Sequence, residues 1–197
     1  GIYFYKNHQF LLVDLPGTYS LLAQSVEEEI ARDFICFGEP DATIVVLDAT
    51  ALERNLNLAL QIIEITSRVV ICVNLVDEAR KKGISIDILA LEKELGVPVV
   101  GTSALRKEGL KELQEAVFKI AVNKQKTHPK QVTYSDEVES LLKMLQSKIE
   151  AVGLGGLLSS RWLALRLLDD DDNFIDEVGR FIECSAARRI ESDWKEV

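Results

Sequence analysis

The sequence predicts an α/β fold in which a doubly wound, mostly parallel sheet is followed by a small all-α helical domain. Two observations lead to this prediction. From residue 1 to about residue 123, short runs that are apolar on both faces alternate with amphipathic segments, as in a parallel sheet covered by helices on both sides. Beyond residue 134, the apolar residues recur only at helical spacing.

The expected strands are short apolar runs. The first, Ile2–Tyr5, is rich in residues that favour strands. Four continuous runs follow it: Phe10–Asp14, Ala42–Asp48, Val69–Asn74 and Val97–Gly101. We expect these four runs to lie side by side, with their carboxyl ends at one edge of the sheet.

The first two helices between these strands have recognisable ends. Ser25 and Glu28 have the spacing of a capping box, and Gly38 is expected to end the first helix. Thr50 and Glu53 have the same spacing and are expected to open the second helix. The buried stripe of the second helix is expected at Leu52, Leu56, Leu60 and Ile63.

Two more helices complete this half of the chain. Asp87 is expected to cap a short helix that ends at Gly96, and residues 109–122 form the last one. The polar, basic segment 124–134 then contains a proline and is expected to be a linker.

These boundaries predict a first domain over residues 1–123 and a helical domain over residues 135–197. Within the helical domain, we expect helices over residues 138–152 and 160–168, and one or two more within residues 174–190.

The composition excludes some functional classes. The chain has 197 residues, and 32 acidic against 23 basic side chains give it a net charge of −9. Such a chain lacks the positive surface that nucleic-acid phosphates require, so we expect no nucleic-acid partner. No apolar run approaches the roughly 20 residues that a membrane-spanning helix requires, and we expect this part of the protein to be soluble.

Polar motifs follow the ends of three expected strands, which is where ligands bind in open α/β sheets. The first motif is Asp14-Leu15-Pro16-Gly17. A carboxylate at a strand end can hold Mg²⁺, usually through water. A glycine three residues later lets a backbone N–H group approach a phosphate.

The second motif is Asn74-Leu75-Val76-Asp77. Its carboxylate can accept both N–H donors of a guanine edge, and its asparagine can tie neighbouring loops together. A loop of small residues, Thr102-Ser103-Ala104-Leu105, follows the last strand and offers backbone N–H groups to a base oxygen. Each motif alone occurs by chance and suits an ordinary strand-end turn, but their order and positions together favour a nucleotide site.

This set of motifs resembles the guanine-nucleotide-binding domain of translation-factor-related GTPases, a P-loop-GTPase-like sheet. Longer strings narrow the resemblance to the ferrous iron transport protein B (FeoB) family and cover almost the whole chain. The strings lie at residues 12–21, 27–33, 48–58, 74–84, 102–110 and, in the helical domain, 161–168. Leu75 stands where many GTPases have a lysine, and the iron transporters also have an apolar residue there.

The resemblance implies a bacterial-type Fe²⁺ transporter whose GTPase lies at the cytoplasmic face of the cell (inner) membrane, where GTP binding and hydrolysis control iron uptake. It implies GTP or GDP and Mg²⁺ as cofactors, and the membrane pore domain of the same polypeptide as a partner. Asp14 would hold Mg²⁺ through water. The implied nucleotide-binding residues are Asp14, Leu15, Pro16, Gly17, Asn74, Leu75, Val76, Asp77, Ser103, Ala104 and Leu105, and the second switch would include Thr18, Tyr19 and Ser20.

The phosphate-binding loop that should precede these motifs, G-x-x-x-x-G-K-[S/T], does not occur in the sequence. We therefore expect an N-terminally truncated GTP-binding domain that binds nucleotide through the base and hydrolyses no GTP measurably. An exposed sheet edge would favour a homo-oligomer. Two alternatives stay open: a soluble GTPase of the ribosome-assembly type, which the absence of a strongly basic tail disfavours, and a structural fragment without activity.

Overall fold

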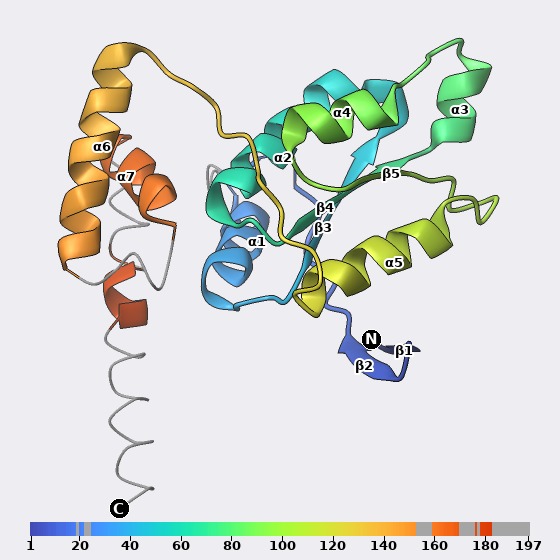
Figure 1. Cartoon of the computed structure of the whole chain (residues 1–197), viewed down its shortest axis with the longest axis horizontal. Helices are drawn as coiled ribbons and strands as arrows, with labels where there is room; N and C mark the ends of the chain where they lie inside the picture. Colours follow the sequence, from blue (N-terminus) through green and yellow to red (C-terminus); the bar gives the residue numbers. More distant parts are fainter. Residues whose placement is uncertain (19, 22–24, 153–158, 170–175, 177, 183–197) are drawn as a thin grey trace, which may run out of the picture. The chain divides into compact units, whose positions relative to one another are not determined.

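The computed structural model describes residues 1–18, 20–21, 25–152, 159–169, 176 and 178–182. The chain divides into two compact units, Gly1–Val132 and Thr133–Val197 (Figure 1). The first unit contains the α/β part of the fold, and the described part of the second unit is helical.

The sheet of the first unit is parallel, as the sequence predicted. It contains β3 (Thr43–Asp48), β4 (Val69–Asn74) and β5 (Val99–Gly101) in the order β3-β4-β5. In β4, the central strand, every residue except Asn74 is buried, which explains why the strand is apolar on both faces.

Helices cover both faces of this sheet. They are α1 (Val26–Phe37), α2 (Leu52–Ile65), α3 (Val76–Lys81), α4 (Ile88–Leu95) and α5 (Leu110–Ala121). In Figure 1, α2 and α4 lie on one side of the strands and α5 lies on the other. Val117 and Ile120 of α5 pack against Val70 of β4. The arrangement confirms the predicted doubly wound fold.

Phe10–Asp14 does not form a strand of the parallel sheet, so that expectation is wrong. The chain forms an antiparallel hairpin instead, with β1 (Ile2–Tyr5) and β2 (His8–Leu11). Its two-residue turn, Lys6 and Asn7, has positive φ angles of 46° and 62°, which directs His8–Leu11 back along Ile2–Tyr5. The hairpin packs on Phe118 of α5.

The helix ends at α1 and α4 agree with the sequence. The Ser25 hydroxyl accepts the Glu28 N–H at 3.3 Å, and the Asp87 carboxylate accepts the Ala90 N–H at 2.9 Å. Gly96 ends α4 in the left-handed conformation.

The expected start of α2 is wrong. A 3₁₀ turn, η1 (Ala49–Ala51), precedes the helix, and the Asp48 carboxylate accepts the Thr50 N–H at 2.7 Å. The buried face of α2 also differs from the expected stripe and is concentrated in the second half of the helix. Ile63 is buried as expected, whereas Leu52, Leu56 and Leu60 are half-buried; the buried apolar residues of α2 are Leu58, Ala59, Ile62, Ile63 and Ile65.

The segment that we expected to be a linker follows the first unit closely. The His128 N–H donates to Gly96 O at 3.1 Å, and the Lys130 N–H donates to Leu95 O at 3.0 Å. The Val132 N–H then donates to Glu64 Oε1 at 3.1 Å. Residues 124–132 therefore belong to the first compact unit.

The second unit contains α6 (Asp136–Ala151) and α7 (Ser160–Leu168), close to the ranges predicted. Trp162 of α7 is almost fully buried, and Arg161 Nη1 and Nη2 donate to the two carboxylate oxygens of Glu139 at 3.0 and 2.9 Å. Most of the segment 174–190, where we expected one or two more helices, lies outside the described residues.

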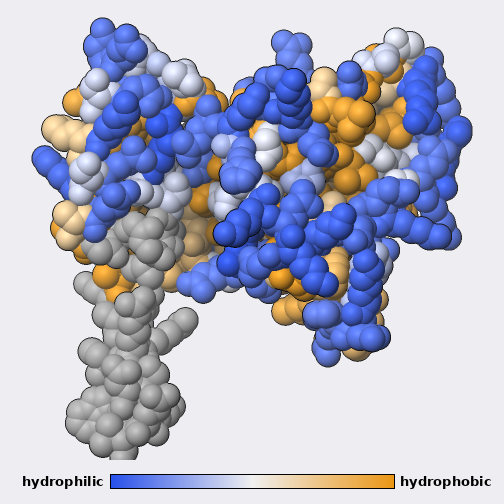
Figure 2. Space-filling model, viewed as in Figure 1, coloured by the Kyte–Doolittle hydropathy of each residue, from blue (hydrophilic) through white to orange (hydrophobic). Residues whose placement is uncertain are grey.

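Hydrophilic side chains dominate the face shown in Figure 2, and an apolar group reaches the surface over α4. Leu89 of α4 is 79% exposed. Among the helices that the structure describes, none has the length and hydrophobicity needed to cross a bilayer.

Candidate functional site

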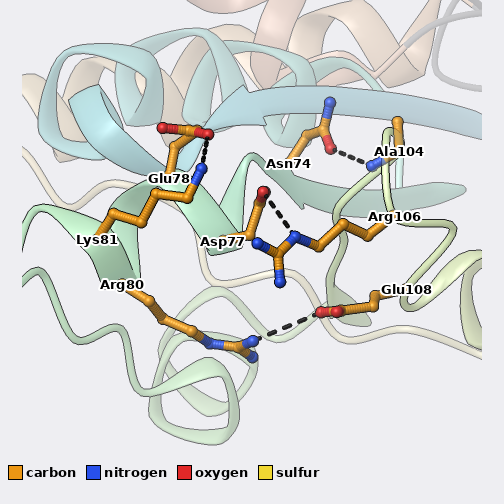
Figure 3. Close-up of polar contacts among 8 residues, drawn as sticks. All are labelled: Asn74, Asp77, Glu78, Arg80, Lys81, Ala104, Arg106 and Glu108. Carbon is orange, nitrogen blue, oxygen red and sulfur yellow. Dashed lines mark hydrogen bonds and ion pairs between the residues drawn. The ribbon is translucent and has the colours of Figure 1, made fainter.

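The end of β4 and the loop after β5 meet at Asn74. Its Oδ1 atom accepts the Thr102 hydroxyl at 3.1 Å. The same atom accepts the Ala104 N–H at 3.2 Å (Figure 3). Asn74 lies at the end of β4 because it is the last residue of a buried apolar run. One amide side chain therefore fixes the position of the small-residue loop relative to the central strand.

Backbone hydrogen bonds join the same two segments. The Thr102 N–H donates to Val73 O at 2.8 Å, and the Val76 N–H donates to Thr102 O at 3.1 Å. Between them, Leu75 has a left-handed backbone with φ 64°, which turns the chain from β4 into α3. The Leu75 side chain is 37% exposed.

Asp77 lies in the first turn of α3 and its side chain is 5% exposed. The neighbouring buried Ser103 side chain is the main cause that holds the pKa of Asp77 below its ordinary value. The Ser103 hydroxyl nevertheless makes no hydrogen bond of ordinary geometry among the described residues. Arg106 and Lys81 lower this pKa further, whereas burial opposes the shift. Asp77 is therefore an enclosed, ionised carboxylate at neutral pH.

Residues 103–108 form a short closed loop that we call the base loop. Ser103 and Glu108, the first and last residues of the loop, exchange two backbone hydrogen bonds of 3.1 Å. Lys107 has φ 58°, and Leu105 at the tip is 89% exposed. Figure 3 shows the loop beside α3, with Arg106 directed toward Asp77 and Glu108 toward Arg80.

Gly109 follows the base loop with φ 73°. A Cβ atom at this position would collide with the carbonyl oxygen of Gly101 at the end of β5. Only glycine fits this close approach, which joins the base loop to the start of α5.

The remaining residues that the sequence predicted for the site, the Val76 side chain and Asp14–Gly17, do not join the cluster of Asn74, Asp77 and the base loop. Val76 lines a cavity of about 540 Å³ with Ala79, Ile84, Ile86 and Ile88. Residues 12–18 follow the β1–β2 hairpin without regular structure, so Asp14 is not at the end of a parallel strand. No hydrogen bond or ion pair among the described residues joins Asp14–Gly17 to the Asn74–Asp77 segment.

The expected second switch is only partly described. The Thr18 hydroxyl contacts the backbone of Ser20, and the Ser20 hydroxyl donates to Gln61 Oε1 of α2 at 3.4 Å. Tyr19 lies outside the described residues.

The described residues do not form a Mg²⁺ site by themselves. They contain no cluster of three or more carboxylate, cysteine or histidine side chains placed to hold a metal. Asp14 offers one exposed carboxylate. A Mg²⁺ ion that enters with a nucleotide keeps several waters and needs only one or two protein carboxylates, so Asp14 fits that limited role.

Sequence reasoning missed four residues that contribute to this site. Arg106 pairs with Asp77, and the Arg80–Glu108 pair supports the same loop. Ion pairs between separate segments have no sequence spacing that would identify them. Gly109 carried a signal, because a glycine before a helix can indicate a left-handed residue, but we assigned it only to the helix start.

A parallel sheet wound on both faces, with Asn74 and Asp77 after β4 and a small-residue loop after β5, defines a G domain, here joined to a helical domain. The chain belongs to the ferrous iron transport protein B (FeoB) family. The family model named ferrous iron transport protein B matches residues 1–117, and the model of the FeoB cytosolic helical domain matches residues 134–196.

Relatives of known name agree with this assignment. The Fe(2+) transporter FeoB of Escherichia coli K12 is 36% identical over 191 residues, covering 92% of this chain and 24% of the relative. The chain thus spans about a quarter of the length of the curated relatives it matches first.

Solved structures of the family share the fold. The cytosolic domain of the T. maritima FeoB iron transporter in a GDP form has a TM-score of 0.83 and 37% identity, covering 92% of this chain and 70% of that one. The GMPPNP form of the same domain has a TM-score of 0.82 and 38% identity, covering 92% and 71% of the two chains.

Proposed function

We propose that this chain binds guanine nucleotides and is part of the nucleotide-dependent regulatory module of a Fe²⁺ transporter. The observation that supports this most directly is the enclosed, ionised carboxylate of Asp77 beside a loop that Asn74 holds in place. The solved relatives named in GDP and GMPPNP forms add support, because this chain shares their fold and is 37% and 38% identical to them over the matched region.

Guanine recognition follows from the chemistry of these groups. The two oxygens of Asp77 accept the N1–H and N2–H donors of guanine, a pair that adenine does not present. In the base loop, the Ser103 and Ala104 N–H groups are engaged by Glu108 O and Asn74 Oδ1. The Leu105 N–H makes no hydrogen bond in the described structure and is the group left to meet the guanine O6 atom.

The two faces of the base would be covered by apolar side chains. Leu75 follows Asn74 and is 37% exposed, and Leu105 of the base loop is 89% exposed, so both side chains are free to contact a bound base. A leucine in place of the usual lysine at position 75 gives contact area without a charge. We therefore propose that base binding here depends on hydrogen bonds to Asp77 and on apolar stacking.

The phosphate side of the site is less complete in this chain. Asp14 would hold Mg²⁺ through water, Gly17 would approach the γ-phosphate, and Leu15 and Pro16 would shape the turn between them. Phosphoryl transfer is catalysed by positioning and charge stabilisation, most of which a phosphate-binding loop supplies. Because the sequence contains no such loop, we propose that the chain as given binds nucleotide through the base and hydrolyses no GTP measurably.

A titration with a fluorescent GDP analogue, beside the matching ADP analogue, tests the proposed site. Guanine-selective binding that Asp77→Asn weakens by about tenfold or more is the expected result. Glu78→Gln is the matched control, because Glu78 is the next residue of α3 and pairs with Lys81 instead of facing the base loop. Binding that does not distinguish the two nucleotides, or that survives Asp77→Asn unchanged, would contradict the proposal. Magnesium-dependent GTP turnover above background would overturn the proposed inactivity.

We also propose that in the intact transporter this module lies at the cytoplasmic face of the cell membrane, joined to a membrane pore domain of the same polypeptide. The relatives support this, because they are named as Fe(2+) transporters and are about four times longer than the matched region. Nucleotide-dependent Fe²⁺ uptake by the intact protein, and its loss in Asp77→Asn, would test the regulatory role.

Self-association is a separate part of the proposal. β3 is an edge strand of the described sheet, and Val46 at its centre is 59% exposed. Such an edge, with apolar side chains and no lysine or proline, is suited to pairing with another copy. Light scattering that shows only monomer at high concentration would count against it.

A further inference from the structure

Two ion pairs of opposite polarity join α3 to the base loop (Figure 3). Arg106 of the loop lies with its Nε atom 3.2 Å from Oδ2 of Asp77. Arg80 of the helix lies with its Nη1 atom 3.4 Å from Oε2 of Glu108. The Arg106 side chain is 52% exposed, whereas the Asp77 side chain is 5% exposed. The guanidinium therefore occupies the outer side of a carboxylate that is otherwise enclosed.

The guanidinium of arginine and the recognition edge of guanine carry the same donor pattern. In both, two N–H groups on neighbouring nitrogens of one planar carbon point in parallel at an acceptor. A carboxylate matches either pair with its two oxygens. Arg106 already takes Oδ2 of Asp77, which is one of the two oxygens that guanine requires.

We propose that Arg106 is an internal competitor for guanine at Asp77, so that the base binds only after the guanidinium has moved away. This inference rests on the proposed guanine site. The exposed Arg106 side chain can rotate into solvent without unfolding the loop, because the Ser103–Glu108 backbone bonds and the Arg80–Glu108 pair do not involve it. Arg106 thus lowers the affinity for guanine while leaving the loop in place.

The competition has a kinetic consequence. The Arg106–Asp77 pair exists only in the nucleotide-free chain, so its loss raises the association rate constant and leaves the dissociation rate constant unchanged. Since one partner of the pair is half-exposed, we expect an affinity gain of about two- to fivefold. Salt screens an exposed guanidinium, so the ratio of the two affinities, Arg106→Gln to the unmodified chain, falls toward one as ionic strength rises.

The test compares Arg106→Gln with Lys107→Gln in the 197-residue chain. Both substitutions remove one positive charge from the same exposed loop, but Lys107 forms no ion pair among the described residues. Stopped-flow binding of a fluorescent GDP analogue, at low and high salt, gives both rate constants. In a nucleotide-free arm, the Asp77 carboxyl group is titrated by carbon NMR, and Arg106→Gln is expected to raise its pKa more than Lys107→Gln does.

The outcomes separate this inference from the guanine site itself. Faster association and unchanged dissociation in Arg106→Gln alone support the competition. Guanine-selective binding by the unmodified chain with weaker or unchanged binding by Arg106→Gln overturns the competition and leaves the guanine site standing. Guanine binding that appears only in Arg106→Gln supports both. Absence of binding in every variant overturns both, and an Asp77 titration that Arg106→Gln does not move refutes the ion pair directly.

Discussion

The side chain of Asn74 and the backbone of Ala104 are joined by a hydrogen bond of 3.2 Å, although the two residues belong to different strand ends. The same Oδ1 atom also accepts the Thr102 hydroxyl. Thr102 is 1% exposed, and its hydroxyl lies 3.2 Å from the sulfur of Cys72 in β4. The base loop is thus positioned by a buried polar chain that begins inside the sheet.

Asn74→Ala is expected to lower the free energy of unfolding of the first unit by about 1–3 kcal/mol, because the buried Thr102 hydroxyl and the Ala104 N–H lose a shared acceptor. Urea denaturation followed by far-UV circular dichroism measures the loss. Asn55→Ala is the control, since among the described residues the Asn55 amide makes one exposed hydrogen bond, to Ala51 O of the adjoining η1 turn. An equal loss in both variants would show that Asn74 has no special role.

Asp77→Asn is expected to change which purine is preferred. Guanine presents two N–H donors to this side chain, whereas xanthine presents one N–H donor and one carbonyl oxygen. An amide offers one acceptor and one donor, so it matches xanthine and leaves a guanine donor unpaired. We expect guanine affinity to fall by about tenfold or more and xanthine affinity to rise. Competition between GDP and XDP for a fluorescent nucleotide measures both, and a fall for both bases would point to a collapsed site.

Sequence reasoning identified the elements whose ends are set by neighbouring residues. Ser25 and Asp87 cap α1 and α4 as expected, because a cap acts through N–H groups two or three residues away. The hairpin was missed because its left-handed turn uses Lys6 and Asn7 without the glycine that usually indicates it. Because His8–Leu11 pairs with Ile2–Tyr5 in this hairpin, Phe10–Asp14 does not form the expected strand of the parallel sheet.

The candidate site shows the same division. Asn74 and Asp77 are recognisable because they follow a buried apolar run at a fixed spacing. The Arg106–Asp77 pair is not recognisable, because it joins segments 29 positions apart whose approach depends on the fold. Local signals therefore led to the prediction of Asn74 and Asp77 as site residues, and only the three-dimensional structure revealed that Arg106 pairs with Asp77.

Glu139→Gln is expected to destabilise the helical unit at neutral pH. The hydrogen bonds that Arg161 donates to Glu139 are the main cause that holds the pKa of Glu139 at about 2, below its ordinary value of 4.5. The hydrogen bond from the Tyr134 N–H is the second cause. The ionised carboxylate therefore stabilises the folded unit above pH 4.5, and this contribution is lost as the pH falls toward 2. The difference in stability between the unmodified chain and Glu139→Gln should shrink over that interval.

Tryptophan fluorescence measures this effect in the helical unit alone, because both tryptophans of the chain, Trp162 and Trp194, belong to it. Glu150→Gln is the control, since Glu150 lies in the same helix and, among the described residues, accepts one exposed hydrogen bond, from the Ser160 hydroxyl at 3.2 Å. A stability difference that stays constant from pH 7 to pH 3 would contradict the role assigned to the Glu139–Arg161 pair.

Gly109→Ala and Gly83→Ala separate backbone strain from steric collision at the end of the base loop. Both glycines have nearly the same left-handed backbone, with φ 73° and 74°. A Cβ atom at Gly83 meets nothing within 4 Å, whereas a Cβ atom at Gly109 collides with Gly101 O. Gly83→Ala should therefore cost only the left-handed conformation, about 1–2 kcal/mol, and Gly109→Ala about 1–3 kcal/mol more. Urea denaturation of the two variants gives the comparison. Equal costs would mean that the end of β5 yields to the added methyl group, and that Gly109 is required for its conformation alone.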